Sequence, residues 1–298
     1  MMEAGLNGET LLVSRLKNKN GTIVVSMNNK VEFKKFEHQG WENAADKYEI
    51  AWSSLTRKFI LPLLNSVGLK EGMRLLDLAC GPGYVSESAK ELCASQIGID
   101  FSERMIQLAR KRNPDLEFYE GDAEHLNFED NTFNAVTMNF GMLHMSEPEK
   151  VFSEAYRVLR KEGRFGFTVW AKPEESPAAK IVDDAINSYA ELNTDIPEGP
   201  SAFLFCNPVE CREMFIKAGF IPDTFSFSTF TIKWNVPTAS FLFESELNGG
   251  VRTAALLARQ TKITLDKIKV IIEKEVEIFK MGDVYSLPFS AHIISSAS

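Results

Sequence analysis

A short glycine-containing loop carries the residues whose types and spacing point most clearly to chemistry. Gly81, Pro82 and Gly83 follow the apolar run at residues 75–78, and Asp100 lies nineteen residues beyond Gly81. Glycine accepts a positive φ and lets a ligand approach the backbone without meeting a Cβ. A carboxylate at this distance falls at the end of the next strand, where it can accept hydrogen bonds from both hydroxyls of a ribose. The loop therefore predicts a site for a nucleoside-containing cofactor.

The same loop favours S-adenosylmethionine over a dinucleotide. A dinucleotide fingerprint carries a third glycine, and here Ser86 stands at that spacing. Pro82 removes one N–H donor that a phosphate would use. Asp77 adds negative charge, which would repel a pyrophosphate and attract an amine or a sulfonium. An NAD(P)-dependent oxidoreductase is the alternative enzyme.

Strand and helix patterns alternate from residue 74 to residue 170. Strands are expected at 96–100, 116–122, 133–140 and 163–170, with a helix at 103–112 that Ser102 caps and another opened by a capping box at 146–149. This alternation predicts a Rossmann-like, doubly wound α/β fold with a mostly parallel seven-stranded sheet and helices on both faces. Ligands of such sheets bind at the carboxyl ends of the strands.

The succession of motifs resembles the class I S-adenosylmethionine-dependent methyltransferases, and within them the ubiquinone/menaquinone C-methyltransferase-like branch. The residues that carry the resemblance are 75–83, 98–102, 121–124, 139–144 and 157–164. The likeness is good across residues 40–170 and loose elsewhere. It is specific for the cofactor and the fold, and it says little about the methyl acceptor.

The resemblance implies a cofactor site whose members come from successive strand ends. Asp100 would hold the ribose, Asp122 would accept from the adenine amine, and Asp77 would lie near the amino group of the methionine part. The full implied set is Asp77, Ala79, Gly81, Gly83, Asp100, Phe101, Met105, Asp122, Ala123, Asn139 and Phe140. Other roles stay open: Asp77 as a structural acid, Asp122 as part of a solvated loop, and Phe140 as core.

Methyl transfer requires little chemical activation by the protein, because the sulfonium of the cofactor is already an activated methyl donor. The enzyme aligns the acceptor for in-line attack, excludes water and sometimes removes a proton. His144 is the best-placed base, and Tyr48 would contact the site from the preceding segment. Each has a structural alternative, His144 as a hydrogen-bonded residue and Tyr48 as packing. No metal-ligand spacing is found, and a catalytically silent S-adenosylmethionine-binding protein remains an alternative.

The flanks are expected to be elaborations of one core. Residues 1–30 would form a leader, as a hairpin or disordered, and 31–66 a helical lid. The core would comprise 67–235 and 284–298, interrupted at 236–283 by a helical cap insertion with a helix capped by Thr264. In the alternative interpretation, the apolar residues of this insertion form the contact surface of a homodimer and do not cover the acceptor.

Composition narrows the class of partner. The chain has 298 residues and a net charge of −8. This charge disfavours nucleic acid as a partner, because proteins that bind nucleic acid usually present a basic surface. No apolar run approaches the length of a membrane span, and no signal peptide is indicated. The four cysteines include no C-x-x-C pair, as expected of a cytoplasmic protein. The expected acceptor is a small apolar or aromatic molecule.

Overall fold

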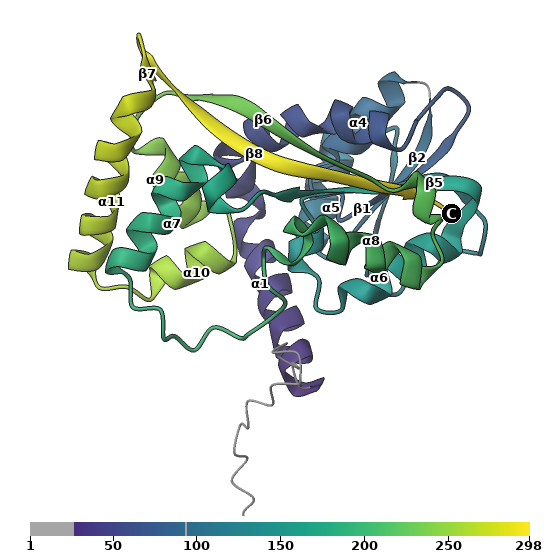
Figure 1. Ribbon diagram of the computed structural model, residues 1–298, viewed down its shortest axis with the longest axis horizontal. Coiled ribbons are helices and arrows are strands. Elements are labelled where there is room, and N and C mark those ends of the chain that lie inside the picture. The colour runs from purple at the N-terminus through teal and green to yellow at the C-terminus, as the bar shows by residue number, and fades with distance from the viewer. Residues whose placement is uncertain (1–26, 93) are drawn as a thin grey trace, which may run out of the picture.

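The computed structural model describes residues 27–92 and 94–298 (Figure 1). The prediction of a hairpin or disorder in the leader falls on residues outside this range, except at its end. Helix α1 (Met27–Ala51) begins before the boundary expected at residue 30, and the division of the chain into leader, lid, core and cap stays a prediction. The chain then continues through the short helices α2 (Ser53–Thr56) and α3 (Ile60–Ser66).

A single mixed sheet forms the centre of the molecule, in the order β3-β2-β1-β4-β5-β8-β6. The first five strands of this order are parallel, and β8 is antiparallel to both of its neighbours, β5 and β6. The prediction of a mostly parallel, seven-stranded α/β sheet is confirmed, with a two-residue strand β7 added against β8. The strands are β1 (Arg74–Leu78), β2 (Ser95–Asp100), β3 (Glu117–Glu120), β4 (Phe133–Asn139), β5 (Leu159–Trp170), β6 (Ser226–Val236), β7 (Lys280–Met281) and β8 (Val284–Ala297).

Alternation along the strands supplies apolar side chains to both faces of the sheet. Leu75 packs in a buried cluster with Ile60 and Leu64 of α3, whereas Leu76 belongs to the cluster that contains Phe152. Successive side chains of a strand point to opposite faces, so both faces need cover. One face is covered by α3, α4 (Tyr84–Glu91) and α5 (Glu103–Arg112), and the other by α6 (Pro148–Val158) and α8 (Pro208–Ala218).

Two helix starts differ from the sequence expectation. The capping box at 146–149 does not form: Ser146 and Glu147 donate their backbone N–H groups to the buried carboxylate of Glu124, at 2.7 and 2.8 Å. A distant carboxylate thus satisfies donors that a local cap was expected to satisfy. In α11 (Lys262–Val276) the cap is Thr261 and not Thr264, since Thr261 Oγ1 accepts from the Thr264 N–H at 3.2 Å.

Thr261→Ala should therefore lower the free energy of unfolding by about 1 kcal/mol, the usual cost of losing a helix cap. Thr264→Ala is the matched control, because it removes the same side chain and leaves the capping oxygen of Thr261 in place. Urea denaturation of the two variants makes the comparison. Equal losses in both variants would contradict the assignment of the cap to Thr261.

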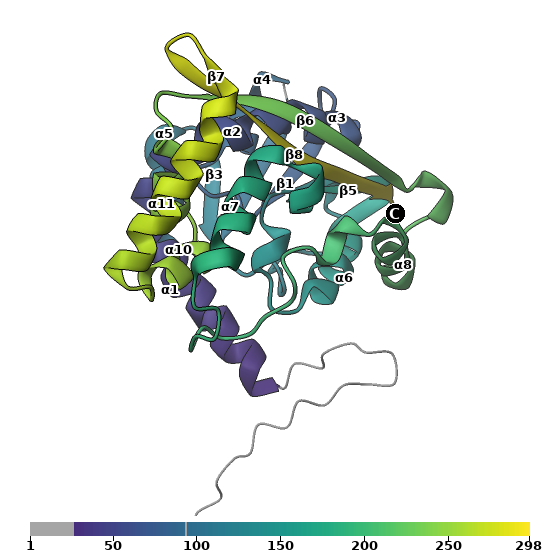
Figure 2. The same cartoon turned by 60° about the vertical axis from the view of Figure 1, so that its left-hand side comes forward.

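A helical cluster lies beside one end of the sheet, where the long strands β6 and β8 extend past the others (Figure 1). It consists of α7 (Pro177–Tyr189), α9 (Phe241–Asn248), α10 (Arg252–Ala258) and α11. Ile268, Ile272 and Val276 of α11 are buried in it, together with Trp234 of β6. Figure 2 shows α7 and α11 side by side. Because α1 contacts both α5 and α9, it connects the sheet region to the helical cluster.

Candidate active site

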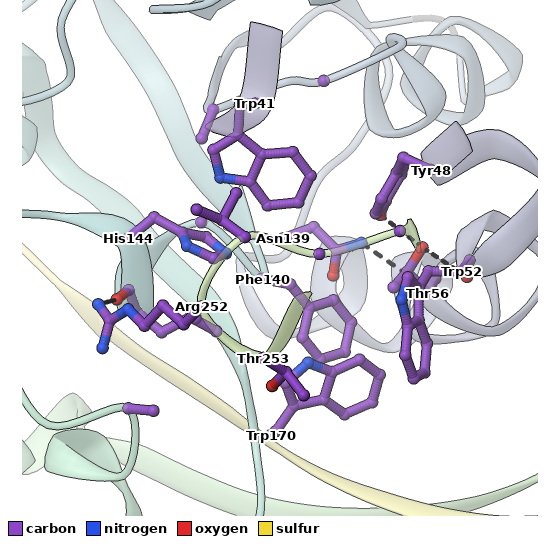
Figure 3. Close-up of a pocket in the computed structure, with 18 of the residues that line it drawn as sticks. Trp41, Tyr48, Trp52, Thr56, Asn139, Phe140, His144, Trp170, Arg252 and Thr253 are labelled. Atoms are coloured by element: carbon purple, nitrogen blue, oxygen red, sulfur yellow. Dashed lines mark hydrogen bonds between the residues drawn. The ribbon is translucent and has the colours of Figure 1, made fainter. Parts of the chain in front are cut away.

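A cavity of about 340 Å³ lies between the carboxyl ends of the parallel strands and the helical cluster (Figure 3). Its position is the one at which open α/β sheets bind ligands, and its size is within the range of small-molecule sites. Most of the residues expected from the sequence line it: Tyr48, Ala79, Gly81, Asp100, Phe101, Met105, Asn139, Phe140 and His144. The topology thus brings together side chains that are far apart in the sequence.

Asp100 is the last residue of β2, and its carboxylate fixes the loop that follows β1 and contains Gly81 and Gly83 (the glycine loop). Its Oδ2 accepts from the Gly81 N–H and its Oδ1 from the Ser102 N–H, both at 2.9 Å. Burial raises the pKa of Asp100 to about 6, although these two backbone donors act in the opposite direction. The carboxylate therefore joins the loop after β1 to the start of α5 while facing the cavity.

Two residues that line the cavity, each directly after a strand, have a strained backbone conformation. Ala79 after β1 has a φ of 49°, and Phe140 after β4 has a φ of 58°. Side-chain-bearing residues adopt this left-handed region at a cost of about 1–3 kcal/mol, and such residues cluster at functional sites. Both residues line the cavity, and the Phe140 ring lies 4.0 Å from that of Trp170.

Asp77 and Gly83 do not line the cavity. Asp77 is fully buried, where it accepts from the hydroxyl of Ser86 at 3.0 Å and from that of Thr137 at 3.4 Å. Burial raises the pKa of Asp77 to about 7. Ser86, which stands where a dinucleotide fingerprint has glycine, thus supports this buried acid. Gly83 has a φ of 82°, and a Cβ there would lie 2.8 Å from Phe118.

Asp122 and Ala123 lie in a smaller cavity of about 20 Å³ beside the large one. The two cavities share Ala79, Phe101, His144 and Met145 in their walls. Asp122 is paired with Lys34 of α1 at 2.5 Å, and the same amine lies 2.7 Å from Glu124. The desolvation of Asp122 opposes its ionisation, yet these contacts keep its pKa below the usual value. The expected contact with an adenine amine stays a prediction.

The side of the cavity that borders the helical cluster is rich in aromatic side chains. Trp52 stacks on Trp234 with ring centres 5.4 Å apart, and it also contacts Trp170 and Phe289. Helix α7 and the α9–α10 connection complete this wall. The lining residues on this side are Trp52, Trp170, Ala179, Val182, Ile186, Phe203, Glu246, Thr253 and Phe289. This half of the cavity suits a flat or apolar molecule that bears few polar groups.

Polar atoms near the centre of the cavity are only partly satisfied. Tyr48 Oη and Thr56 Oγ1 lie 2.9 Å apart, and burial raises the pKa of Tyr48 to about 12. Asn139 donates from Nδ2 to the Thr56 carbonyl at 3.3 Å, while its buried Oδ1 has no hydrogen-bond partner (Figure 3). A buried acceptor without a donor costs free energy, and a bound ligand can remove that cost. The unpartnered Asn139 oxygen fits the expected cofactor site.

His144 is held by two residues that sequence reasoning missed. Its Nδ1 lies 2.8 Å from Oε2 of Glu37 in α1, and the other oxygen of Glu37 lies 2.7 Å from Nε of Arg252 in α10. Burial alone would raise the pKa of the fully buried Glu37, but the contacts with His144 and Arg252 outweigh it and hold that pKa below its usual value. No local signal marks Glu37 or Arg252, because both act through contacts between distant elements.

Within residues 27–92 and 94–298, no helix is both long and apolar enough to cross a membrane. Within the same residues, His, Cys, Asp and Glu side chains form no group of three or more that is arranged to hold a metal ion.

Comparisons with known proteins agree with the geometry of the cavity. The family model described as a methyltransferase domain matches residues 76–167. A demethylmenaquinone methyltransferase of Paenarthrobacter aurescens is 33% identical over 170 residues, which cover 55% of this chain and 67% of that protein. Another from Renibacterium salmoninarum is 29% identical, over 55% of this chain and 72% of that protein.

A solved structure resembles the whole fold. Phosphoethanolamine N-methyltransferase 2 of Haemonchus contortus, in complex with S-adenosyl-L-methionine, aligns with a TM-score of 0.54 and 20% identity. The alignment covers 92% of this chain and 60% of that one, and supports the Rossmann-like α/β architecture. The alternative of an NAD(P)-dependent oxidoreductase is wrong, since the relatives and the domain model are methyltransferases. The chain is an S-adenosylmethionine-dependent enzyme and belongs to the class I methyltransferases, in the branch of the ubiquinone/menaquinone C-methyltransferases.

Proposed function

We propose that the enzyme methylates a small apolar or aromatic acceptor, which binds against the aromatic side of the cavity. The observation that carries this proposal is the wall formed by Trp52, Trp170 and Phe289, on the side of the cavity that borders the helical cluster. Aromatic rings bury large apolar areas and favour other rings at centre distances of about 4.5–7 Å. Relatives named as demethylmenaquinone methyltransferases make a naphthoquinol-like ring the first acceptor to test.

The cofactor would occupy the half of the cavity next to the sheet. In this proposal Asp100 accepts from the ribose hydroxyls, Phe101 and Met105 flank the adenine, and Asn139 and Phe140 lie near the sulfonium. Arg57 lines the cavity beside Pro82 and Tyr84, and would attract the carboxylate of the methionine part. When bound, S-adenosylmethionine supplies an activated methyl group.

The protein would contribute alignment, exclusion of water and proton removal. The cap at residues 236–283 and helix α7 would enclose the acceptor, so that its nucleophilic atom approaches the methyl group in line with the C–S bond. Phe140 lines the cavity, and an aromatic ring near the sulfonium would favour that cation. His144 would accept the proton that the acceptor loses.

Affinity for S-adenosylmethionine should weaken at acidic pH. In the free protein the pKa of Asp100 is about 6, above its usual value because of burial. Only the ionised carboxylate accepts freely from both ribose hydroxyls. As the pH falls through 6, protonation should therefore oppose binding, and the Kd at pH 5 should be about tenfold that at pH 8. Calorimetric titrations across this range measure the effect, and a Kd that stays constant down to pH 5 would contradict the role of Asp100.

The proposed function is tested by production of S-adenosylhomocysteine with a defined acceptor panel. The panel contains 1,4-naphthohydroquinone, catechol and, as a charged aliphatic molecule, phosphoethanolamine. We expect turnover above the acceptor-free rate with an aromatic member, and mass spectrometry should find one added methyl group in the product. Turnover with phosphoethanolamine alone would overturn the proposal for the acceptor class.

A matched pair of variants locates the acceptor. Val182→Trp would fill the aromatic side of the cavity and should reduce turnover, whereas Val209→Trp places the same ring on an exposed position of α8. Affinity for S-adenosylhomocysteine should be similar in both variants. Equal turnover of the two variants would show that the acceptor binds elsewhere.

A further inference from the structure

Glu37 joins three separate parts of the molecule through one buried carboxylate. The residue lies on α1, His144 lies after β4, and Arg252 begins α10 in the helical cluster. Glu37 is 0% exposed, with Oε2 at 2.8 Å from His144 Nδ1 and Oε1 at 2.7 Å from Arg252 Nε. Each carboxylate oxygen thus has its own partner.

Arg252 is fixed by further contacts on every side. It donates from Nη1 to the Pro200 carbonyl at 2.8 Å and from Nη2 to the Leu143 carbonyl, and its guanidinium lies 4.5 Å from the centre of the Phe33 ring. An arginine side chain can only donate hydrogen bonds. The partner of its Nε–H must therefore be an acceptor, which the ionised Glu37 provides.

The same carboxylate determines which nitrogen of His144 carries the proton. Ionised Glu37 can only accept, so Nδ1 of the neutral His144 ring must be the protonated nitrogen. Nε2 is then the nitrogen with a free electron pair. The ring lines the cavity and packs edge-on against Trp41 with ring centres 4.9 Å apart, which restricts its rotation (Figure 3).

We propose that Glu37 is a positioning residue that keeps His144 in the Nδ1–H tautomer, with Nε2 available as the base. This inference rests on the proposed function of His144 in proton removal. The electron pair of the acceptor atom forms the bond to the methyl carbon, the C–S bond breaks with its pair left on sulfur, and the proton of the acceptor goes to Nε2. Because Glu37 comes from α1 and Arg252 from α10, the base is assembled only when both elements are docked.

Glu37→Gln tests the proposal without requiring an acceptor. Since Arg252 only donates, the amide oxygen of the new side chain should face Arg252, and its NH₂ group should face His144 Nδ1. The neutral ring should then change to the Nε2–H tautomer. Nitrogen-15 NMR of the ring separates the two tautomers, and a His144→Gln variant identifies the signals. A neutral His144 that remains in the Nδ1–H form in Glu37→Gln would overturn the proposal.

Two further variants separate tautomer control from simple structural support. Asp46→Asn changes another α1 carboxylate to an amide, at an exposed ion pair with Arg104 of α5, and should leave the His144 tautomer unchanged. Combining Glu37→Gln with Arg252→Met frees the amide to turn its oxygen toward Nδ1, and should restore the Nδ1–H form in part. A tautomer change in Asp46→Asn equal to that in Glu37→Gln would overturn the proposal.

The catalytic consequence is measured with the acceptor that the panel identifies. Glu37→Gln should lower kcat by about 100-fold with little change in KM, because loss of a general base costs at least that much. The double variant should recover part of this loss. An unchanged kcat in a protein whose tautomer has changed would overturn the role of Glu37 in catalysis, whereas a wild type without acceptor turnover would count against the proposed acceptor and leave the NMR result standing.

Discussion

Asp100→Ala should raise the Kd for S-adenosylmethionine by at least about 100-fold, because it removes a charged acceptor from the ribose. Hydrogen bonds to charged groups contribute about 1.5–3 kcal/mol each, and two are expected here. The substitution also frees the N–H groups of Gly81 and Ser102, which the carboxylate now holds at 2.9 Å. The glycine loop would then lose its fixed position. Calorimetric titration with S-adenosylmethionine measures the change.

A control at an exposed acid isolates the local effect of Asp100. Asp115 pairs with Lys90 at the surface of the same region, and Asp115→Ala should leave the Kd unchanged. Circular dichroism of both variants establishes that the fold is intact. A folded Asp100→Ala protein with wild-type affinity would remove Asp100 from the cofactor site.

Asp77→Asn should stabilise the protein at alkaline pH, by up to roughly 4 kcal/mol at pH 8. Burial raises the pKa of Asp77 in the folded state to about 7, well above the 3.8 of the exposed carboxyl. The folded state therefore binds the proton more tightly, and stability is lost as the pH rises from 3.8 to 7. Asparagine keeps a polar group between Ser86 and Thr137 and carries no charge.

Urea denaturation at pH 4 and pH 8 tests this expectation, with wild type and Asp77→Asn measured together. The stability difference should be small at pH 4 and should grow toward pH 8. A variant that is less stable than wild type at pH 8 would show that the buried carboxylate is favourable as an ion. Its affinity for S-adenosylmethionine separately tests the expectation that Asp77 lies near the amino group of the cofactor.

Local patterns were sufficient to predict the sheet and much of the cavity. The apolar runs before Gly81 and Asp100 end at a common edge of a parallel sheet, so the resemblance could place residues such as Asn139 and Phe140 beside them. The predicted cap Ser102 accepts from the Met105 N–H at 3.1 Å, because capping depends only on a few neighbouring residues. Asn207 caps α8 in the same local way, because its side chain accepts from the Val209 N–H at 3.0 Å.

Residues that act across the fold could not be predicted in this way. Glu37 meets Arg252 only because α1 passes between the sheet and the helical cluster, and nothing near either residue signals this contact. Glu124 also acts between distant parts of the chain. Its carboxylate accepts from the N–H groups at the start of α6, where a local capping box was expected. Thr261 and Thr264 are equally good caps by type, and the start of the helix decided between them.

The most direct test of the account is a crystal structure with S-adenosylhomocysteine bound. We predict the ribose hydroxyls within hydrogen-bond distance of Asp100, the sulfur toward Phe140, and the space beside Trp52 and Trp170 left free for the acceptor. An adenosyl group bound against Trp52 and Trp170, with Asp100 untouched, would contradict the assignment of the two halves of the cavity.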